Sequence, residues 1–157
     1  MSQKVFIEPR RLVGIQATGP SSFNPVENSG AKFGEQLWHE FIEKVVTAGI
    51  SLDRDMYGVS WPADENVPPE KIHYFCGFES DQNFDSFKEL NLDGGNYFEY
   101  SCEVLAVDLD KGFQEAYMSA LPASGQKVRE GQHLEIYGDE YDPDSPVAKF
   151  RILIPVI

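Results

Sequence analysis

The sequence predicts an α+β fold made of two βαββ repeats, and three observations support this prediction. Two segments, residues 31–48 and 108–121, carry apolar side chains at the spacing of an amphipathic helix. Short runs of alternating apolar and polar residues flank both segments and are typical of strands. The same order of elements recurs after a shift of 80 residues. We therefore expect antiparallel sheets with two main helices, related by a pseudo-two-fold axis.

The first helical segment has the clearest periodic pattern. Gly49 follows it, at the position where a helix often places a left-handed C-terminal residue. Burial of each large apolar side chain contributes roughly 1.5–3 kcal/mol, so this helix is expected to lie against a sheet or another helix. The apolar stripe consists of Phe33, Leu37, Trp38, Phe41, Ile42, Val45 and Val46.

The second helical segment begins at Asp108, a good N-cap residue, and Pro122 is expected to stop it. Its apolar stripe consists of Leu109, Phe113, Ala116, Tyr117, Ala120 and Leu121.

Strands are expected in the intervals around these helices. The expected ranges are 12–18, 56–61, 72–78, 97–104, 133–137 and 148–156. The segments 62–69 and 138–146 are rich in Pro and Asp and are expected to be loops. The segment Leu92-Asp93-Gly94-Gly95-Asn96 is explained better by a tight turn before a strand than by phosphate binding.

The shift of 80 residues also relates individual side chains. It places Tyr57-Gly58 on Tyr137-Gly138, and the helical Phe33, Leu37 and Phe41 on Phe113, Tyr117 and Leu121. We interpret the chain as one domain, residues 1–157, with a first repeat at about 4–80 and a second at about 92–157. A ligand cleft is expected between the halves, because pockets favour such junctions.

The charge of the chain restricts its partners. The 157 residues include 26 acidic and 13 basic side chains, for a formal net charge of -13. Because phosphate contacts supply most of the affinity for nucleic acid, we expect no direct binding to DNA or RNA. Many acids are typical of a soluble surface, and a negative field also concentrates positively charged ligands.

No metal or other cofactor is predicted. Cys76 and Cys102 lack CxxC spacing, and His39, His73 and His133 are scattered. Two buried thiols are expected, although the sequence leaves their pairing open. Neither a signal peptide nor a membrane span is expected, so a cytoplasmic location is the default.

A candidate ligand site centres on the segment Leu134-Glu135-Ile136-Tyr137. Its alternation places Glu135 and Tyr137 on one strand face. The matching positions of the first half are Tyr57 and Trp61. A carboxylate among aromatic rings suits an organic cation, because each ring contributes about 0.5–2 kcal/mol through cation–π attraction.

Each of these residues also has a simpler interpretation. Glu135 is equally compatible with a cross-strand ion pair to Lys149 or Arg151. For Tyr57, Trp61 and Tyr137, the residues alone favour plain core packing over ligand contact. The remaining candidate ligand contacts are Trp38 on the first helix, Phe75 on the 72–78 strand, and Tyr97 and Glu99 on the 97–104 strand. For that last strand, either Tyr97 with Glu99 or Phe98 with Tyr100 faces the ligand.

Enzyme signatures are absent or weak. The chain contains no GxSxG, HExxH, Walker A or GxGxxG motif. A buried Glu and Tyr pair would suit general acid–base catalysis as well as binding, so the motifs name no catalytic residue.

These residues resemble the GyrI-like, or AraC-type effector-binding, domain family over nearly the whole chain. The resemblance includes a Trp-bearing first helix. The similar segments are Leu12-Val13-Gly14-Ile15 through Thr18-Gly19-Pro20, Met56-Tyr57-Gly58-Val59, Leu92-Asp93-Gly94-Gly95, Leu121-Pro122-Ala123-Ser124-Gly125, Leu134-Glu135-Ile136-Tyr137 and Phe150-Arg151-Ile152-Leu153-Ile154-Pro155-Val156. One departure is Ser101-Cys102-Glu103-Val104-Leu105, where many members have a Gly-containing turn.

The resemblance implies a curved surface with a central cleft, in which Glu135 is the acidic pocket residue and Tyr57 and Tyr137 are pocket tyrosines. Members of this family sense effectors or drugs on transcription regulators, or occur alone. Because the first strand starts near Lys4, the chain is more similar to the stand-alone, multidrug-binding members.

Three functions follow, in order of preference. The first is a receptor for bulky hydrophobic, often cationic, small molecules, acting by sequestration or by informing a transcription regulator. Its expected protein partner is that regulator or a second copy of the chain. The second is a small-molecule hydrolase that uses Glu135 as base and Tyr137 or Tyr57 as acid. The third is an acidic protein partner of a nucleic-acid enzyme.

Overall fold

The computed structural model describes residues 2–21, 29–67 and 69–157. These residues form two compact units, each an α+β arrangement. Unit 1 contains residues 1–10 and 92–157, and unit 2 contains residues 11–91.

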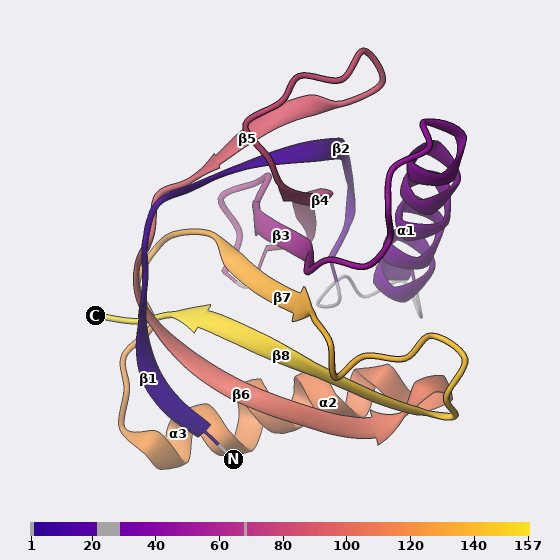
Figure 1. Ribbon diagram of the computed structural model, residues 1–157. Coiled ribbons are helices and arrows are strands. Elements are labelled where there is room, and N and C mark those ends of the chain that lie inside the picture. The colour runs from indigo at the N-terminus through magenta and orange to yellow at the C-terminus, as the bar shows by residue number, and fades with distance from the viewer. Residues whose placement is uncertain (1, 22–28, 68) are drawn as a thin grey trace. The chain divides into compact units, whose positions relative to one another are not determined.

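Unit 2 is built from four strands and one long helix (Figure 1). Its elements are β2 (Arg10–Pro20), α1 (Ser29–Thr47), β3 (Met56–Pro62), β4 (Lys71–Glu79) and β5 (Lys88–Leu92). The strands lie in the order β3-β4-β2-β5, and β4 pairs antiparallel with both β2 and β3. The helix α1 packs against β4.

Unit 1 repeats this plan. Its strands are β1 (Ser2–Ile7), β6 (Gly95–Leu105), β7 (His133–Tyr137) and β8 (Val147–Pro155). They lie in the order β1-β6-β8-β7, and every pair is antiparallel. Read from the other end, this order matches that of unit 2, with β7, β8, β6 and β1 in the places of β3, β4, β2 and β5. The predicted α+β class with two βαββ units is confirmed.

The helical segment of unit 1 connects β6 to β7 along the chain, and its helix type changes along its length. It consists of a 3₁₀ turn η1 (Ala106–Asp108), α2 (Leu109–Glu115), a π-helix η2 (Ala116–Ala120) and α3 (Leu121–Ser124). In Figure 1 its coils run along one face of β6 and β8. The 3₁₀ turn η1 follows β6 directly.

Asp108 occupies the N-cap position of α2, as predicted, but its side chain makes no capping hydrogen bond and contacts Lys111 at 3.6 Å. The predicted end of this segment is wrong. Pro122 does not stop the helix, because it lies in the first turn of α3, where its missing N–H costs no hydrogen bond. The chain leaves the helix at Gly125, whose φ of 73° is left-handed.

The six predicted strand ranges are confirmed within one or two residues at each end. The first strand, expected near Lys4, is β1. The prediction missed β5, because its charged sequence Lys88-Glu89-Leu90-Asn91 lacks a strong apolar alternation. The tight turn before β6 is confirmed by Gly94 and Gly95, with φ values of 79° and 117°. Position 68 of the predicted loop 62–69 lies outside the described residues.

Each unit has its own aromatic or apolar core. In unit 2, the fully buried Phe41 of α1 lies against the rings of Trp38, Phe78 and Phe87, at centroid distances of 5.7, 6.3 and 5.8 Å. In unit 1, the helical segment covers a core whose buried members are Phe98, Cys102, Ala116, Leu121, Ala148, Phe150, Ile152, Ile154 and Val156. Cys76 and Cys102 are buried free thiols, as predicted.

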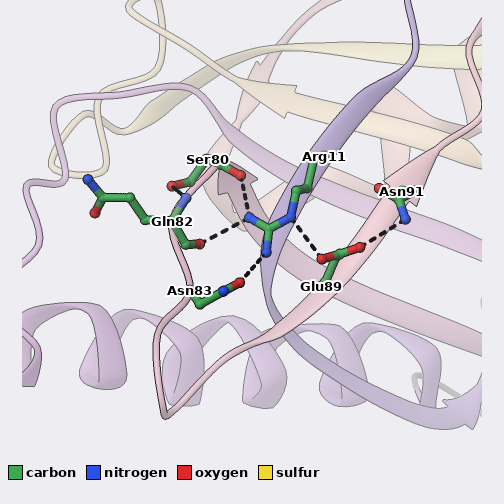
Figure 2. Close-up of polar contacts among 6 residues, drawn as sticks. All are labelled: Arg11, Ser80, Gln82, Asn83, Glu89 and Asn91. Carbon is green, nitrogen blue, oxygen red and sulfur yellow. Dashed lines mark hydrogen bonds and ion pairs between the residues drawn. The ribbon is translucent and has the colours of Figure 1, made fainter.

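Arg11 ties β2 to the β4–β5 connection of unit 2 (Figure 2). Its guanidinium donates to the Ser80 carbonyl at 2.7 Å, the Gln82 carbonyl at 3.0 Å and the Asn83 side chain at 2.5 Å. It also contacts the Glu89 carboxylate at 2.8 Å. The bond from Arg11 holds the pKa of Glu89 below its usual range.

We expect Arg11→Lys to lower the free energy of unfolding by roughly 1–2 kcal/mol. A lysine keeps the positive charge beside Glu89. Its compact ammonium cannot donate hydrogen bonds to several separate acceptors at once, as the planar guanidinium does. Urea unfolding followed by circular dichroism would measure the loss. Arg54→Lys is the matched control, because Arg54 donates to a backbone carbonyl, that of Ser51, and lies over the Phe78 ring. Equal losses for the two variants would contradict a clamp role for Arg11.

Candidate functional site

The strand β7 presents two different faces. Leu134 and Ile136 are buried on one face, whereas His133, Glu135 and Tyr137 are half-buried on the other. The predicted alternation of this strand is therefore confirmed. The second face is the one that meets the helical segment of unit 1, since Tyr137 packs against the core beneath that segment.

Glu135 and Tyr137 form the centre of the candidate site. The Tyr137 hydroxyl donates a hydrogen bond to Glu135 Oε1 at 2.9 Å. The ring of Tyr137 is stacked on Phe150 at 5.0 Å and meets the edge of Tyr141 at 4.9 Å. One carboxylate oxygen is thus held by a phenol whose ring is fixed on both sides.

The helical segment adds a second phenol to this face. Tyr117 lies in the π-helix η2, and its hydroxyl is 2.7 Å from Nδ1 of His133. The two rings are stacked, with an interplanar angle of 17°. A π-turn widens the helix locally and is frequent at functional sites. We call Tyr117, His133, Glu135, Tyr137 and Tyr141 the Glu135 cluster.

The environment of the cluster changes the acidity of its members. Burial raises the pKa of Tyr117, and the nearby negative charge of Glu135 raises it further. Burial lowers the pKa of His133 to about 4, and the charge of Arg129 adds to this effect. At neutral pH, Tyr117 is therefore a protonated phenol and His133 is an uncharged imidazole.

Arg129 is held in place by the backbone. It donates to the carbonyls of Val156 at 3.0 Å, Asn96 at 3.1 Å and Gly94 at 3.3 Å. Its guanidinium carbon lies 5.1 Å from the centre of the Tyr97 ring. This cation therefore has a structural role, and it contributes a fixed positive charge near His133.

The cross-strand register separates Glu135 from the two bases considered as its partners. Glu135 lies opposite Ile152 of β8, whereas Arg151 lies opposite Ile136. Because side chains alternate along a strand, Arg151 and Lys149 are both on the sheet face opposite to Glu135.

Both bases contact other acids. Lys149 Nζ lies 3.8 Å from the Glu103 carboxylate, and Arg151 Nε lies 3.4 Å from the Glu140 carboxylate. Each of these two bases therefore has an acidic contact other than Glu135.

The candidates from the first half lie in unit 2. Tyr57 and Phe75 are core residues of that unit, with exposed fractions of 3% and 0%. Trp61 is half-buried beside the His73 ring at 5.5 Å. Trp38 is half-buried on α1 and donates from Nε1 to the Tyr74 hydroxyl at 2.7 Å. Ligand contact by these four residues stays a prediction, as does the cleft between the halves.

Tyr97 and Glu99 lie in unit 1, on the face of β6 opposite to Glu135. The register places Glu99 opposite Leu153, whereas Tyr100 lies opposite Ile152, in the same row as Glu135. Tyr97 is 1% exposed and donates to the Gln132 carbonyl at 3.0 Å, and Glu99 accepts from Gln3 at 3.2 Å. Their role as ligand contacts also stays a prediction.

Sequence reasoning missed the contribution of Tyr117 and Tyr141 to the site. Tyr117 was assigned to the apolar stripe of a helix, and Tyr141 lies in a segment expected to be a loop. The alternation of the 133–137 strand did place His133 on the same face as Glu135 and Tyr137, and the structure agrees.

The structure also bears on metals and membranes. The described parts of the chain contain no group of three or more His, Cys, Asp or Glu side chains arranged to hold a metal ion. Within residues 2–21, 29–67 and 69–157, no helix has the length and apolar character needed to cross a membrane.

The sequence matches one protein family over its whole length. The GyrI-like small molecule binding domain covers residues 1–157. This chain belongs to that family. The resemblance read from the sequence motifs is thus confirmed, and the GyrI-like fold agrees with the two βαββ units described above.

Solved structures share the GyrI-like fold at low sequence identity. SAV2435, solved with bound tetraphenylphosphonium, has a TM-score of 0.76 at 17% identity, over 100% of this chain and 94% of that chain. An integron cassette protein from the mobile metagenome of Vibrio cholerae has a TM-score of 0.69 at 15% identity, over 99% and 95%. The C-terminal domain of EcmrR has a TM-score of 0.62 at 13% identity, over 100% and 97%.

A curated relative is longer than this GyrI-like chain. The right origin-binding protein of Escherichia coli K12 is 22% identical over 162 residues. The match covers 97% of this chain and 54% of that protein, so the chain spans about half of the length of this relative.

Proposed function

We propose that this GyrI-like chain binds bulky, hydrophobic organic cations beside Glu135. The observation that carries the proposal is the hydrogen bond from Tyr137 to Glu135, on a strand face lined by aromatic rings. A half-buried carboxylate neutralises the charge of a desolvated cation, and the surrounding rings attract it through their negative faces.

Two further facts support a cation rather than an anion. Both bases of β8 lie on the opposite face of the sheet, as the register requires. The net charge of -13 also favours the approach of positively charged ligands. The bound tetraphenylphosphonium of SAV2435 is a bulky hydrophobic cation, which supports this ligand class by similarity of fold.

The physiological role that fits such binding is effector sensing or sequestration. Relatives by fold include the C-terminal domain of EcmrR, and EcmrR has also been solved in a complex with DNA. We propose that the present chain binds the small-molecule ligand in such a system. We also propose that it does not itself contact nucleic acid, because its net negative charge opposes contacts with phosphate groups.

Replacement of Glu135 by Gln is expected to weaken the binding of tetraphenylphosphonium ten- to hundredfold, equivalent to about 1.5–3 kcal/mol. The amide keeps the shape of the carboxylate and can still accept from Tyr137, so mainly the charge is lost. Isothermal titration calorimetry at pH 7 would measure both dissociation constants.

The matched control is Glu103→Gln, which removes an exposed carboxylate of the same unit that pairs with Lys149. This control should leave the affinity within about twofold of wild type, since exposed charges are screened by salt. Equal affinities of wild type and the Glu135→Gln variant would refute the proposal.

A further inference from the structure

The strand β1 stands at one end of the strand order, so only one of its two edges is paired within the described chain. That edge pairs with β6 in an antiparallel register that runs unbroken from Ser2↔Tyr100 to Ile7↔Gly95. The outer edge of an end strand presents a row of backbone N–H and C=O groups to any strand that approaches it. The outer edge of β1 is therefore a surface for strand addition.

The features that usually protect such an edge are missing from β1. Its six residues contain no proline, and its register with β6 contains no β-bulge. Its one charged side chain, Lys4, is turned back onto its own unit, because Nζ donates to the Ile157 carbonyl at 3.0 Å. Gln3 likewise donates across the strand pair to Glu99 at 3.2 Å. Both polar side chains are thus directed away from the outer edge.

Three exposed apolar side chains accompany this strand at one end of unit 1. Phe6 is 63% exposed, Val128 is 50% exposed and Ile157 is 69% exposed. Phe6 lies opposite Asn96, whose carbonyl accepts a hydrogen bond from the Val156 N–H. Val156 in turn forms a β-bridge with Val128. A strand added beside Phe6 would remove apolar surface from water.

We propose that a second copy of this chain pairs with β1, so that two β1 strands join antiparallel about a two-fold axis at Val5. Such an interface is isologous, because each copy contributes the same strand. The axis places Val5 opposite Val5 of the second copy. It also places Lys4 opposite Phe6 of the second copy, and this contact occurs twice.

The sequence of β1 is complementary to itself in this register. The aliphatic stem and ammonium of Lys4 meet the exposed Phe6 ring of the second copy, a favourable cross-strand pair. Glu8 is exposed just beyond β1 and comes diagonally beside Lys4 of the second copy, so the opposite charges are neighbours. An axis at Lys4 is unfavourable, because it sets the two ammonium groups opposite each other.

The other end strand of the order, β5, is a poorer surface for strand addition. Two of its five side chains, Lys88 and Glu89, are charged and exposed. Charged side chains on an edge oppose the approach of a further strand. The proposal therefore assigns the interface to β1, and β5 supplies the control.

Cysteine cross-linking tests the position of the axis. In Val5→Cys the two introduced thiols face each other, at a Cα separation of about 4.5–5.5 Å that suits a disulfide. Gln3→Cys is the matched control, because it lies on the same face of β1 but its two thiols are about 13 Å apart along the strands. The native Cys76 and Cys102 are buried. After mild oxidation, non-reducing electrophoresis should show a covalent dimer for Val5→Cys alone.

Sedimentation analysis measures the same interface without a cross-link. Wild type should dimerise with a dissociation constant on the order of micromolar. Lys4→Glu should weaken the dimer about tenfold or more, because the new carboxylate lies beside Glu8 of the second copy and loses the contact with Phe6. Lys88→Glu makes the same charge change on β5 and should leave the dissociation constant within about twofold of wild type.

The outcomes decide between this interface and any other. A wild-type chain that stays monomeric at roughly 0.1 mM would overturn the proposal. A dimer that Lys4→Glu does not weaken would do the same, as would a covalent dimer of Gln3→Cys in place of Val5→Cys. If circular dichroism shows that Lys4→Glu is unfolded, the two cysteine variants decide. None of these experiments includes a cation, so their failure leaves the proposed function unaffected.

Discussion

Phe150→Ala is expected to lower the free energy of unfolding by about 3–5 kcal/mol, the range for a buried Phe truncated to Ala. Phe150 is 1% exposed in the core of unit 1. Its ring lies between Tyr137, at 5.0 Å, and Phe113, at 5.8 Å, so its removal leaves a cavity bordered by two aromatic rings. Urea unfolding at pH 7, followed by circular dichroism, would measure the loss.

The same substitution should also weaken cation binding, because the stack on Phe150 fixes the ring of Tyr137. Phe150→Leu gives a milder test, since it keeps an apolar core residue and removes the flat ring surface. We expect this variant to remain folded and to bind tetraphenylphosphonium about three- to tenfold more weakly, as the loss of one aromatic contact of about 0.5–1.5 kcal/mol would produce.

Phe41→Leu in unit 2 is the matched control for this link between packing and binding. Phe41 is also fully buried among aromatic rings, but these rings belong to unit 2, whereas the Glu135 cluster belongs to unit 1. The two Leu variants should lose comparable stability, and weaker binding should follow from the substitution in unit 1 alone. Unchanged affinity of the Phe150→Leu protein would contradict the proposed support of Tyr137.

The strands were the most predictable part of this fold. Ile72 to Phe78 and Ala148 to Val156 combine apolar alternation with β-branched and aromatic residues, so local sequence is sufficient to identify them. The strand β5 has neither property, and it is held by its partner β2 in the sheet. Local propensity is a poor guide where tertiary pairing decides.

The second helix shows how a local rule can be overridden. Pro122 was expected to end the helix because proline normally disrupts the bonding of the preceding turn. The π-helix η2 changes that bonding, since the Leu121 N–H reaches back to the Ala116 carbonyl, five residues earlier. The chain can therefore begin a new α-turn at Pro122. Single-sequence periodicity contains no signal for such a change of winding.

The site was predictable along one strand and much less so across strands. Alternation in β7 correctly placed Glu135 and Tyr137 on one face, because the period of a strand is a local property. The question of an ion pair with Arg151 depended on the β7–β8 register, which only the folded structure supplies. The bond between Tyr117 and His133 joins a helix to a strand and has no sequence signature.

Acidification should destabilise the protein through His133. Its pKa is about 4 in the folded chain, compared with an ordinary value of 6.5. Between these two values the unfolded chain binds a proton that the folded chain does not, so the free energy of unfolding decreases as the pH falls below 6.5. The loss from this group should be about 2 kcal/mol at pH 5 and about 3 kcal/mol near pH 4.

The groups around His133 explain why the folded state resists this proton. Burial disfavours the charged imidazole, and the fixed positive charge of Arg129 repels it. The Glu135 carboxylate, two residues along the same strand face, is the group that would favour the charge. Since the folded pKa is lowered, the unfavourable contributions outweigh it.

Urea unfolding at pH 7 and pH 5 would test this balance in wild type and His133→Asn. The asparagine does not titrate, so the stability difference between the two pH values should shrink by about 2 kcal/mol in that variant. His39→Asn is the control, because His39 is exposed on α1 and its change should leave the difference unaltered. An identical pH dependence in wild type and His133→Asn would mean that the imidazole is readily protonated in the folded chain, and would contradict the lowered pKa of this buried group.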